Sequence, residues 1–433
     1  MKKPGILIAA FLAVLVTIGG LSVYAFFDEK TISEEENRSL AKYTAFSSDT
    51  WFSGDYAKGL ESFLSDHVYE RTELVAVAQK LETFMERKTD IKLVTHNASD
   101  MAGNADTDAE KAPDENTDVP GGNSGDVETV APAQEGDNQQ DRLVLDDRIL
   151  QIYHDAPDAL AYYSKVSNSF FAMFPDYIGK YLLVAPSRIA FETKDVAAYS
   201  DDQKAAIETI YDKLDPLVTT IDAYSALEAN SQRLDDLYYR TDHHWTHLGA
   251  YYAAEAMFKE IGLHYSPLNE YERNEGNGFL GYYYAQDPSP SLKEHEDELI
   301  YYLPTKHDVP KAVLYINAKD GGYDTEDTVT VNPMRGGYYT FAGSSFAYSV
   351  MEGAKKDGGC MLLVADSYGN TFGTWLAENY ERVIQIDPRD FSEGKEGVMK
   401  LADKYGVTDV MICDYLGAVD TVYFPSQIEH LTE

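Results

Sequence analysis

Cysteine, tryptophan and histidine are scarce in this chain of 433 residues, which holds 2, 3 and 10 of them respectively. Two cysteines cannot supply the four ligands of a structural zinc site by themselves. Cys360 and Cys413 both lie in apolar runs, "CMLLVADS" and "DVMICDY", that are typical of buried strands. We therefore expect two buried thiols, with a disulfide between neighbouring strands as the alternative.

Basic residues are also few: 36 Lys and Arg stand against 73 Asp and Glu, a formal net charge of −37. Nucleic-acid binding depends on a basic surface, so this charge argues against such a partner. The hydrophobic share of 44% is enough for a sizeable core. By length, the chain has room for two or three domains.

One segment near the start carries no charge at all. Gly5 to Phe27 is an apolar run of 23 residues, preceded by Lys2 and Lys3. About 20 apolar residues span a bilayer, and the lysines favour a cytoplasmic N-terminus. Residues 1–27 thus predict a single-pass membrane anchor with the remainder exported. A signal peptide cleaved after "VYA", residues 23–25, is the alternative.

The next two segments differ sharply in composition. Residues 28–96 predict a helical segment, with Leu60, Phe63, Leu64 and Val68 at helical spacing. Residues 97–141 contain 12 acidic residues, one lysine and almost no large apolar side chain. Such a composition cannot offset the entropy of ordering, so we expect a disordered acidic insert. It is either a spacer from the membrane or a tolerated loop insertion.

Residues 142–433 predict one α/β domain. Apolar strands at 181–187 and 217–224 and in "CMLLVADS", "RVIQID" and "TDVMICDY" alternate with helical patterns. This alternation indicates a parallel sheet covered by helices on both faces. Residues 265–345 are rich in Tyr, Gly and Pro and favour hairpins or long loops that could shape a site.

Ser367 lies where ligands gather in such sheets. It follows the apolar strand 362–365, and a helix is expected to start around Asn370. A helix N-terminus next to a strand end offers free N–H groups and partial positive charge for an oxyanion. Taken alone, a serine at this position also fits a plain helix cap.

The stretch "TDHHWTH", residues 241–247, could supply the base that a serine nucleophile needs. Asp242, two residues before His244, could hold the imidazole in one tautomer. Thr246 is suited to cap the following helix, and Trp245 to pack beneath the loop. A metal site made by Asp242, His244 and His247 is one alternative, and a purely structural capping role is another.

"TDHHW" resembles the signature of the DHHW protein family, which is similar to alginate O-acetyltransferases of the AlgX/AlgJ type with SGNH-hydrolase-like domains. "SEEENRSLAKY" (33–43), "WFSGDYAKGLESFLSDHVYERTELV" and "LLVADSYGNTF" with "VIQIDPRDF" downstream resemble further blocks of the family. The resemblance implies an SGNH-hydrolase-like parallel sheet flanked by helices.

The same resemblance implies roles for single residues. Ser367 becomes the nucleophile, His244 the general base and Asp242 its orienter. The residues implied for oxyanion support or substrate binding are Asn370, Gly343, Tyr368, Trp245 and Arg389. An ion pair with Asp387 or Asp366 is the structural alternative for Arg389. Neither a metal nor a cofactor is implied.

The function expected from these features is O-acyl transfer, with acetyl as the expected group, to a polysaccharide outside the cell membrane. The resemblance implies a membrane-bound O-acyltransferase as the acyl donor. Two alternatives stay open at this point. A carbohydrate acetylesterase would use the same triad with water as the acceptor, and a glycan-binding or scaffold component would keep the fold without catalysis.

Overall fold

The computed structural model describes residues 32–33, 38–39, 42–43, 45–47, 50–51, 55–66, 92–94, 141–318, 321–342 and 346–433. Contacts divide the chain into two compact units. One comprises Met1–Asp90, Thr129–Pro132 and Tyr284–Lys293, and the other comprises Ile91–Glu128, Ala133–Tyr283 and Glu294–Glu433. The second unit holds the large sheet and all the residues of the candidate site described below.

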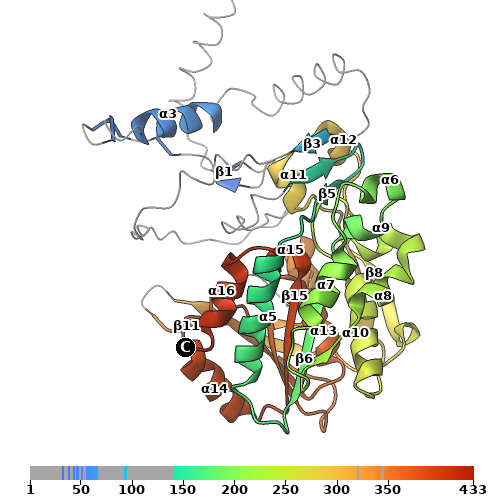
Figure 1. The fold of residues 1–433 in the computed structure, drawn as a ribbon. Coiled ribbons are helices and arrows are strands. Elements are labelled where there is room, and N and C mark those ends of the chain that lie inside the picture. The colour runs from blue at the N-terminus through green and yellow to red at the C-terminus, as the bar shows by residue number, and fades with distance from the viewer. Residues whose placement is uncertain are drawn as a thin grey trace, which may run out of the picture. The chain divides into compact units, whose positions relative to one another are not determined.

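A mixed sheet of eight strands organises the second unit (Figure 1). Its order is β11-β10-β12-β14-β13-β15-β6-β7. The bounds are β6 Gly179–Ala185, β7 Thr219–Thr220, β10 Lys311–Asn317, β11 Tyr323–Val329, β12 Tyr348–Glu352, β13 Cys360–Ala365, β14 Arg382–Ile386 and β15 Asp409–Tyr415. Strands β14, β13, β15, β6 and β7 run parallel, whereas β12, β10 and β11 are joined by antiparallel pairings.

Helices cover both faces of the sheet, because successive strand residues point to opposite sides. Leu362 and Val364 of β13 pack into a core with α5 (Pro157–Phe171), α7 (Gln203–Tyr211), α14 (Gly394–Tyr405) and α16 (Tyr423–His430). Leu363 and Ala365 pack instead with α8 (Ala223–Glu228), α10 (His247–Glu260) and α13 (Tyr368–Ala377). The second of these cores brings α10 and α13 together, and both helices begin at candidate site residues.

The remaining elements are short. Strands β3 (Lys92–Val94), β4 (Arg142–Val144) and β5 (Ile149–Gln151) form a small antiparallel sheet, and β8 (Tyr271–Glu275) pairs with β9 (Ile300–Pro304). The other elements are β1 Ile32–Ser33, β2 Arg38–Ser39, α3 Asp55–Asp66, α6 Lys194–Ala197, α9 Leu234–Leu237, α11 Tyr282–Gln286, α12 Pro290–Lys293 and α15 Leu416–Val419.

The predicted sheet needs two corrections. It is not wholly parallel. Residues 265–345, expected as hairpins or long loops, contain the hairpin of β10 and β11, and these strands together with β12 form an antiparallel edge of the sheet. The strand expected at 217–224 is only Thr219–Thr220, since Asp222 caps a helix by accepting from the Ser225 N–H at 2.9 Å. The apolar residues predicted a longer strand, but the Asp222 cap starts a helix and so ends the strand early.

The two cysteines are buried free thiols on β13 and β15, as predicted. Helix α3 carries the expected Leu60, Phe63 and Leu64, whereas Val68 lies outside the described residues. The acidic insert falls almost wholly outside them too, and so does the predicted anchor. Within the part of the chain that is described, no helix has both the length and the apolar character needed to cross a membrane.

Candidate active site

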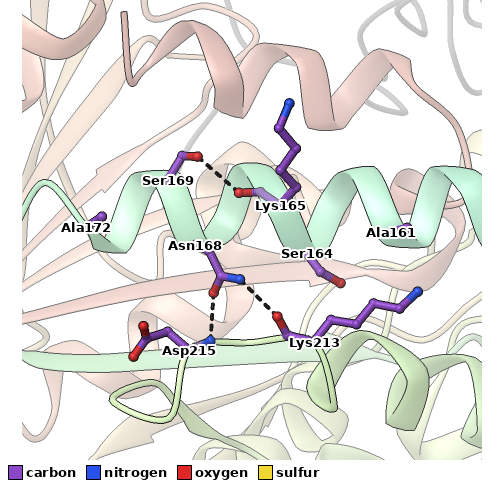
Figure 2. A pocket seen from close by; sticks show the side chains of 8 residues that line it. All are labelled: Ala161, Ser164, Lys165, Asn168, Ser169, Ala172, Lys213 and Asp215. Carbon is purple, nitrogen blue, oxygen red and sulfur yellow. Dashed lines mark hydrogen bonds between the residues drawn. The ribbon is translucent and has the colours of Figure 1, made fainter.

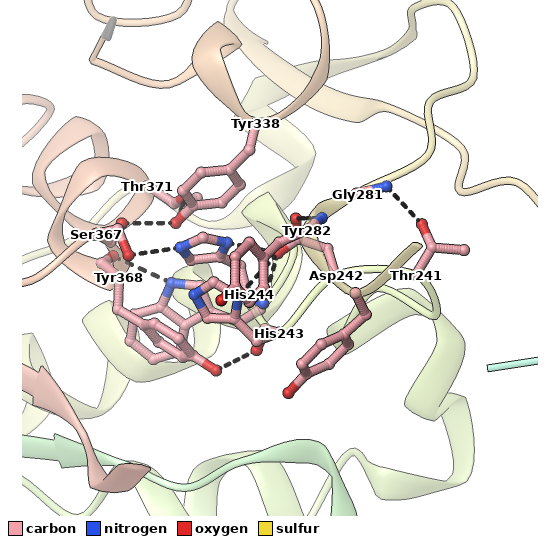
Figure 3. A network of polar contacts seen from close by, with 12 residues as sticks. Thr241, Asp242, His243, His244, Gly281, Tyr282, Tyr338, Ser367, Tyr368 and Thr371 are labelled. Carbon is pink, nitrogen blue, oxygen red and sulfur yellow. Dashed lines mark hydrogen bonds and ion pairs between the residues drawn. The ribbon is translucent and has the colours of Figure 1, made fainter. Parts of the chain in front are cut away.

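Three side chains, two from one loop and one from the turn after β13, form one hydrogen-bonded line (Figure 3). Nε2 of His244 lies 2.7 Å from the Ser367 hydroxyl oxygen. On the other side of the ring, Nδ1 lies 2.6 Å from Oδ1 of Asp242. Both Asp242 and His244 are more than nine-tenths buried. This is the geometry in which a carboxylate orients an imidazole that can accept a hydroxyl proton.

The Asp242 carboxylate is held at both oxygens. Its Oδ1 also accepts from the His244 backbone N–H at 3.0 Å, and its Oδ2 accepts from the Tyr282 N–H at 2.9 Å. Burial alone favours the neutral acid, but the His244 ring and these N–H groups hold the pKa of Asp242 well below its usual range. The carboxylate is therefore ionised and fixed, as an orienting group must be.

The loop that carries Asp242 is braced from behind by Asp297. This buried carboxylate accepts from the N–H of Arg240 at 2.6 Å and from the N–H and hydroxyl of Thr241 at 2.8 and 2.5 Å. Burial raises the pKa of Asp297 to about 6. The Thr241 hydroxyl in turn accepts from the Gly281 N–H at 2.8 Å, so the loop and the turn before α11 are tied together.

Ser367 stands at the N-cap position of α13, immediately after β13 and Asp366. Its side chain makes no capping hydrogen bond, so the hydroxyl is turned to His244 and not to its own helix. A plain cap, the alternative weighed from the sequence, does not describe this serine. The helix begins at Tyr368, two residues earlier than predicted, and this places the serine directly at the positive end of α13.

Trp245 and Tyr368 clamp the loop to the serine turn. The indole N–H of Trp245 donates to the Tyr368 carbonyl at 3.2 Å, and the Tyr368 hydroxyl donates to the His243 carbonyl at 2.5 Å. Both aromatic side chains are fully buried. Trp245 thus packs beneath the loop, as predicted, and neither ring is exposed to make the substrate contact that the family resemblance implied for both residues.

A pair of carboxyl groups lies beneath the serine turn, at the ends of β13 and β15. Asp366 accepts from the N–H groups of Tyr368 and Tyr415 at 2.8 and 2.9 Å. Asp414 accepts from the Asp366 N–H at 3.0 Å and from the Tyr163 hydroxyl at 2.8 Å. Burial raises the pKa of Asp366 to about 7, and burial together with Asp366 raises the pKa of Asp414 well above its usual range.

His247 is not available as a metal ligand. Its Nε2 lies 3.0 Å from the Thr374 hydroxyl, and its Nδ1 accepts from the Tyr302 N–H at 3.1 Å. Burial lowers the pKa of His247 to about 3, so the ring is neutral. The predicted alternative of Asp242, His244 and His247 as a metal site therefore loses its third ligand, because both nitrogens of the His247 ring are already engaged.

A second possible metal site contains His243 in place of His247. Asp242, His243 and His244 place one ligand atom each within 4.8 Å of one another. Oδ1 of Asp242 and Nδ1 of His244 are already hydrogen-bonded to each other. A metal bound through these two atoms would have to break the contact that orients the imidazole.

The remaining predicted site residues are Asn370, Arg389 and Gly343. Asn370, on the first turn of α13, accepts from the Gln385 side-chain amide at 2.8 Å. Arg389 forms a two-pronged ion pair with Asp387 at 2.9 and 2.7 Å, which is the structural alternative considered for it. Gly343 lies outside the described residues. The oxyanion donors thus stay a prediction.

Residues that sequence reasoning missed complete the surroundings of the imidazole. Tyr338 stacks on the His244 ring with 3.7 Å between centroids and 13° between planes. Gly281 leaves room for Asp242, since a Cβ on it would lie 2.3 Å from the Asp242 Cβ. The only signals in the sequence were the glycine pair in "MRGGYY" and the Gly-Tyr run "LGYYY".

Two hollows lie elsewhere on the second unit. One of about 290 Å³ borders the back of the Asp242 loop and includes Tyr239, Arg240 and Asp297 in its lining. The other, of about 540 Å³, follows α5 (Figure 2). In the latter, Asn168 already donates to the Lys213 carbonyl and accepts from the Asp215 N–H, so its amide ties the groove together. Neither lining includes a member of the hydrogen-bonded line.

Comparisons with known proteins agree with this arrangement of strands and helices. A family model described as DHHW protein matches residues 106–386. A solved DHHW family protein from Eubacterium siraeum is 25% identical at a TM-score of 0.58, covering 67% of this chain and 95% of its own. PatB1 of Bacillus cereus, 17% identical, has a TM-score of 0.54 over 65% of this chain and 98% of its own, which shows a similar fold.

A more distant match is the O-acetyltransferase domain of Pseudomonas putida AlgJ. It is 12% identical and covers 66% of this chain and 96% of its own. Its TM-score of 0.34 is too low to carry an argument. A search of curated protein sequences gave no significant match.

Proposed function

Because this chain belongs to the DHHW protein family, we propose that it is a serine-dependent O-acetyltransferase that modifies a polysaccharide at the cell surface. The observation that supports the proposal is the line from Asp242 through His244 to Ser367, with contacts of 2.6 and 2.7 Å. An ester-forming serine needs a base to take its proton, and the base needs a third group to fix its tautomer.

In the first half-reaction, Oγ of Ser367 attacks the carbonyl carbon of an acetyl donor, and its proton passes to Nε2 of His244. A C–O bond to the serine forms, and the bond to the donor's leaving oxygen breaks. That oxygen departs with the proton from His244. The products are an acetyl-serine and the deacylated donor, and Asp242 stabilises the imidazolium between the two proton transfers.

In the second half-reaction, a sugar hydroxyl of the acceptor attacks the acetyl-serine. His244 takes the proton of that hydroxyl, the new ester bond forms, and the bond to Ser367 breaks. Oγ regains the proton from the imidazolium, which restores the resting enzyme. If water took the place of the sugar, the same steps would hydrolyse the ester, so the acceptor decides between transfer and hydrolysis.

We propose a route by which the site stabilises the oxyanion that forms in both steps. Ser367 lies at the N-terminus of α13, where backbone N–H groups carry partial positive charge. We propose that this helix end, with Asn370 on its first turn, faces the developing negative charge. The Asn370 carbonyl is held by Gln385, which leaves its NH₂ group as the donor.

We further propose that the charge-free run at residues 5–27 anchors the enzyme and that the second unit works outside the cytoplasm. The acetyl group must then cross the membrane before it reaches Ser367. A membrane-bound O-acyltransferase is the donor partner implied by the family resemblance. The acceptor we propose is a surface polysaccharide.

The test uses the full-length chain in detergent with p-nitrophenyl acetate as donor, followed by candidate oligosaccharides. We expect release of nitrophenol that depends on Ser367, and acetylated sugar as the second product. His244→Ala should lower the rate by about 10²–10⁴. Equal rates for wild type, Ser367→Ala and His244→Ala would rule out the proposal, and release of acetate alone with every acceptor would favour an esterase.

A further inference from the structure

A short strap, residues 332–341, leads into the candidate site through two glycines. Gly336 and Gly337 have positive φ angles of 63° and 44°, a conformation that side-chain-bearing residues rarely adopt. The strap is closed where the Asn332 N–H donates to the Thr340 carbonyl at 2.7 Å. This glycine pair fixes the direction in which the next residue, Tyr338, projects.

Tyr338 touches both the base and the nucleophile (Figure 3). Its ring lies flat on the His244 imidazole, with 3.7 Å between centroids and 13° between planes. Its hydroxyl donates to the Ser367 carbonyl at 2.9 Å and accepts from the Thr371 hydroxyl at 2.6 Å. The ring is thus pinned at its polar end, so that its face stays on the imidazole.

The opposite face of the imidazole is covered as well. The His243 ring lies there with 3.9 Å between centroids and 34° between planes. His244 is therefore held between two aromatic rings and can move only within its own plane. The titratable or polar groups that face it include Asp242, His243, Tyr338, Ser367 and Tyr368.

The two rings that cover His244 differ in how they interact with a positive charge on the imidazole. An electron-rich phenol face attracts a cation, with an effect that grows when the site is desolvated. The His243 ring lacks the electron density of a phenol, and its Nδ1 is 3.7 Å from Asp242 Oδ1. During each half-reaction proposed above, His244 becomes an imidazolium, and Tyr338 is the phenol ring stacked on it.

We propose that Tyr338 is a positioning residue of this reaction: it keeps His244 in the plane between Asp242 and Ser367 and stabilises the imidazolium that forms when the serine loses its proton. The inference rests on the proposed function, since it assigns a task around the same base. It adds a residue that the Asp-x-His-Trp pattern does not contain and that lies in a different part of the chain.

The test compares Tyr338→Leu with Tyr338→Phe. Leucine keeps an apolar cover but removes the π face, whereas phenylalanine keeps the stack and loses only the hydroxyl. For Tyr338→Leu we expect a loss of about tenfold in kcat/KM for p-nitrophenyl acetate. The acidic limb of the kcat/KM profile should also move to lower pH by about one unit, because protonating the base loses a stabilising contact. Tyr338→Phe should leave the limb in place.

Tyr315→Leu is the matched control. Tyr315 stacks on Tyr348 at 4.1 Å and 9°, the same kind of contact, but on β10 and β12 away from the triad. The Tyr315→Leu substitution should leave the pH profile of kcat/KM unchanged. A Tyr338→Leu enzyme with an unmoved limb would overturn the inference, even if its rate or melting temperature fell, because a merely structural role predicts that result.

A second measurement does not depend on turnover. The imidazole of His244, assigned by its absence in His244→Gln, is titrated by NMR in wild type and in Tyr338→Leu. The inference predicts that the protonation midpoint falls by about one pH unit in the variant, and equal midpoints overturn it. If Ser367→Ala matched wild type in the ester assay, the proposed function would fail, while this titration would still decide the role of Tyr338.

Discussion

His244 and Ser367 are 123 positions apart in the sequence, yet Nε2 of one lies 2.7 Å from Oγ of the other. Packing of α10 against α13 brings their segments together, and the hydrogen bond from Trp245 to the Tyr368 carbonyl fixes the separation. The imidazole and the serine are therefore held by buried structure and not by flexible loops. Preorganisation of this kind is what lowers the cost of reaching a transition state.

Asp242→Asn tests whether the carboxylate sets the tautomer of His244. An asparagine NH₂ group facing Nδ1 favours the tautomer whose proton is on Nε2, which cannot accept a proton from Ser367. We expect the rate of ester cleavage to fall by about 10⁴, as for the corresponding change in other serine triads, with an unchanged circular dichroism spectrum. A variant with more than a tenth of the wild-type rate would exclude the orienting role.

Gly281→Ala tests the fit around that carboxylate. A Cβ at this position would lie 2.3 Å from the Asp242 Cβ and 2.5 Å from its Oδ2, so the aspartate must shift. Displacements of about 1 Å near a reacting group cost about 10²-fold, and we expect a loss of that size. Gly276→Ala is the control, because the nearest atoms to its Cβ are Cδ2, Cγ and Cβ of Leu299, at 2.8, 3.3 and 3.5 Å, and none belongs to the triad. Equal activities for the two variants would contradict the account.

His247→Gln tests a structural role for the last histidine of the cluster. The pKa of His247 is lowered to about 3 by burial, so the folded protein prefers the neutral ring. Its stabilising effect is full above the unfolded value of about 6.5 and is lost as pH falls toward 3. We expect the variant to cost about 1–3 kcal/mol of unfolding free energy at neutral pH and less in acid. A pH-independent difference in denaturant unfolding would contradict this.

Asp414→Asn tests the carboxyl pair under the serine turn. Burial raises the pKa of Asp366 to about 7, so its stabilising effect is full below the unfolded value near 4 and lost as pH rises through 7. The pKa of Asp414 is also raised, by burial and by Asp366, so that removing this second acid should weaken the loss of stability. Between acid and neutral pH, wild type should lose on the order of 1–3 kcal/mol more than the variant. Parallel stability curves for the two proteins would show that the acids do not interact.

Much of the fold could be read from the sequence, because its central strands are apolar runs between helical patterns. β13, β14 and β15 and the helices α7, α10 and α14 lie close to where those patterns place them. The composition of residues 265–345 predicted hairpins or loops, but not that a hairpin would extend the main sheet with antiparallel strands. β11 is largely exposed and polar, with "YDTEDTV" as its sequence, and only its pairing with β10 makes it a strand.

In the candidate site, too, some residues could be predicted from the sequence and others could not. Asp242, His244 and Ser367 carry recognisable chemistry, so residue types and spacing made them candidates, and the family resemblance implied their roles. Tyr338, Gly281 and Asp297 were missed, because a tyrosine, a glycine or an acid has no meaning until the fold shows what lies beside it. The resemblance implied substrate contacts for Tyr368 and Trp245, but both side chains are buried, and for Trp245 the packing beneath the loop was predicted.

The most direct test of the central claim is mass spectrometry of the protein after brief exposure to p-nitrophenyl acetate. The account predicts one acetyl group on the peptide that contains Ser367, absent in Ser367→Ala and strongly reduced in His244→Ala. Acetyl found on another residue, or on Ser367 to the same extent without the imidazole, would contradict it.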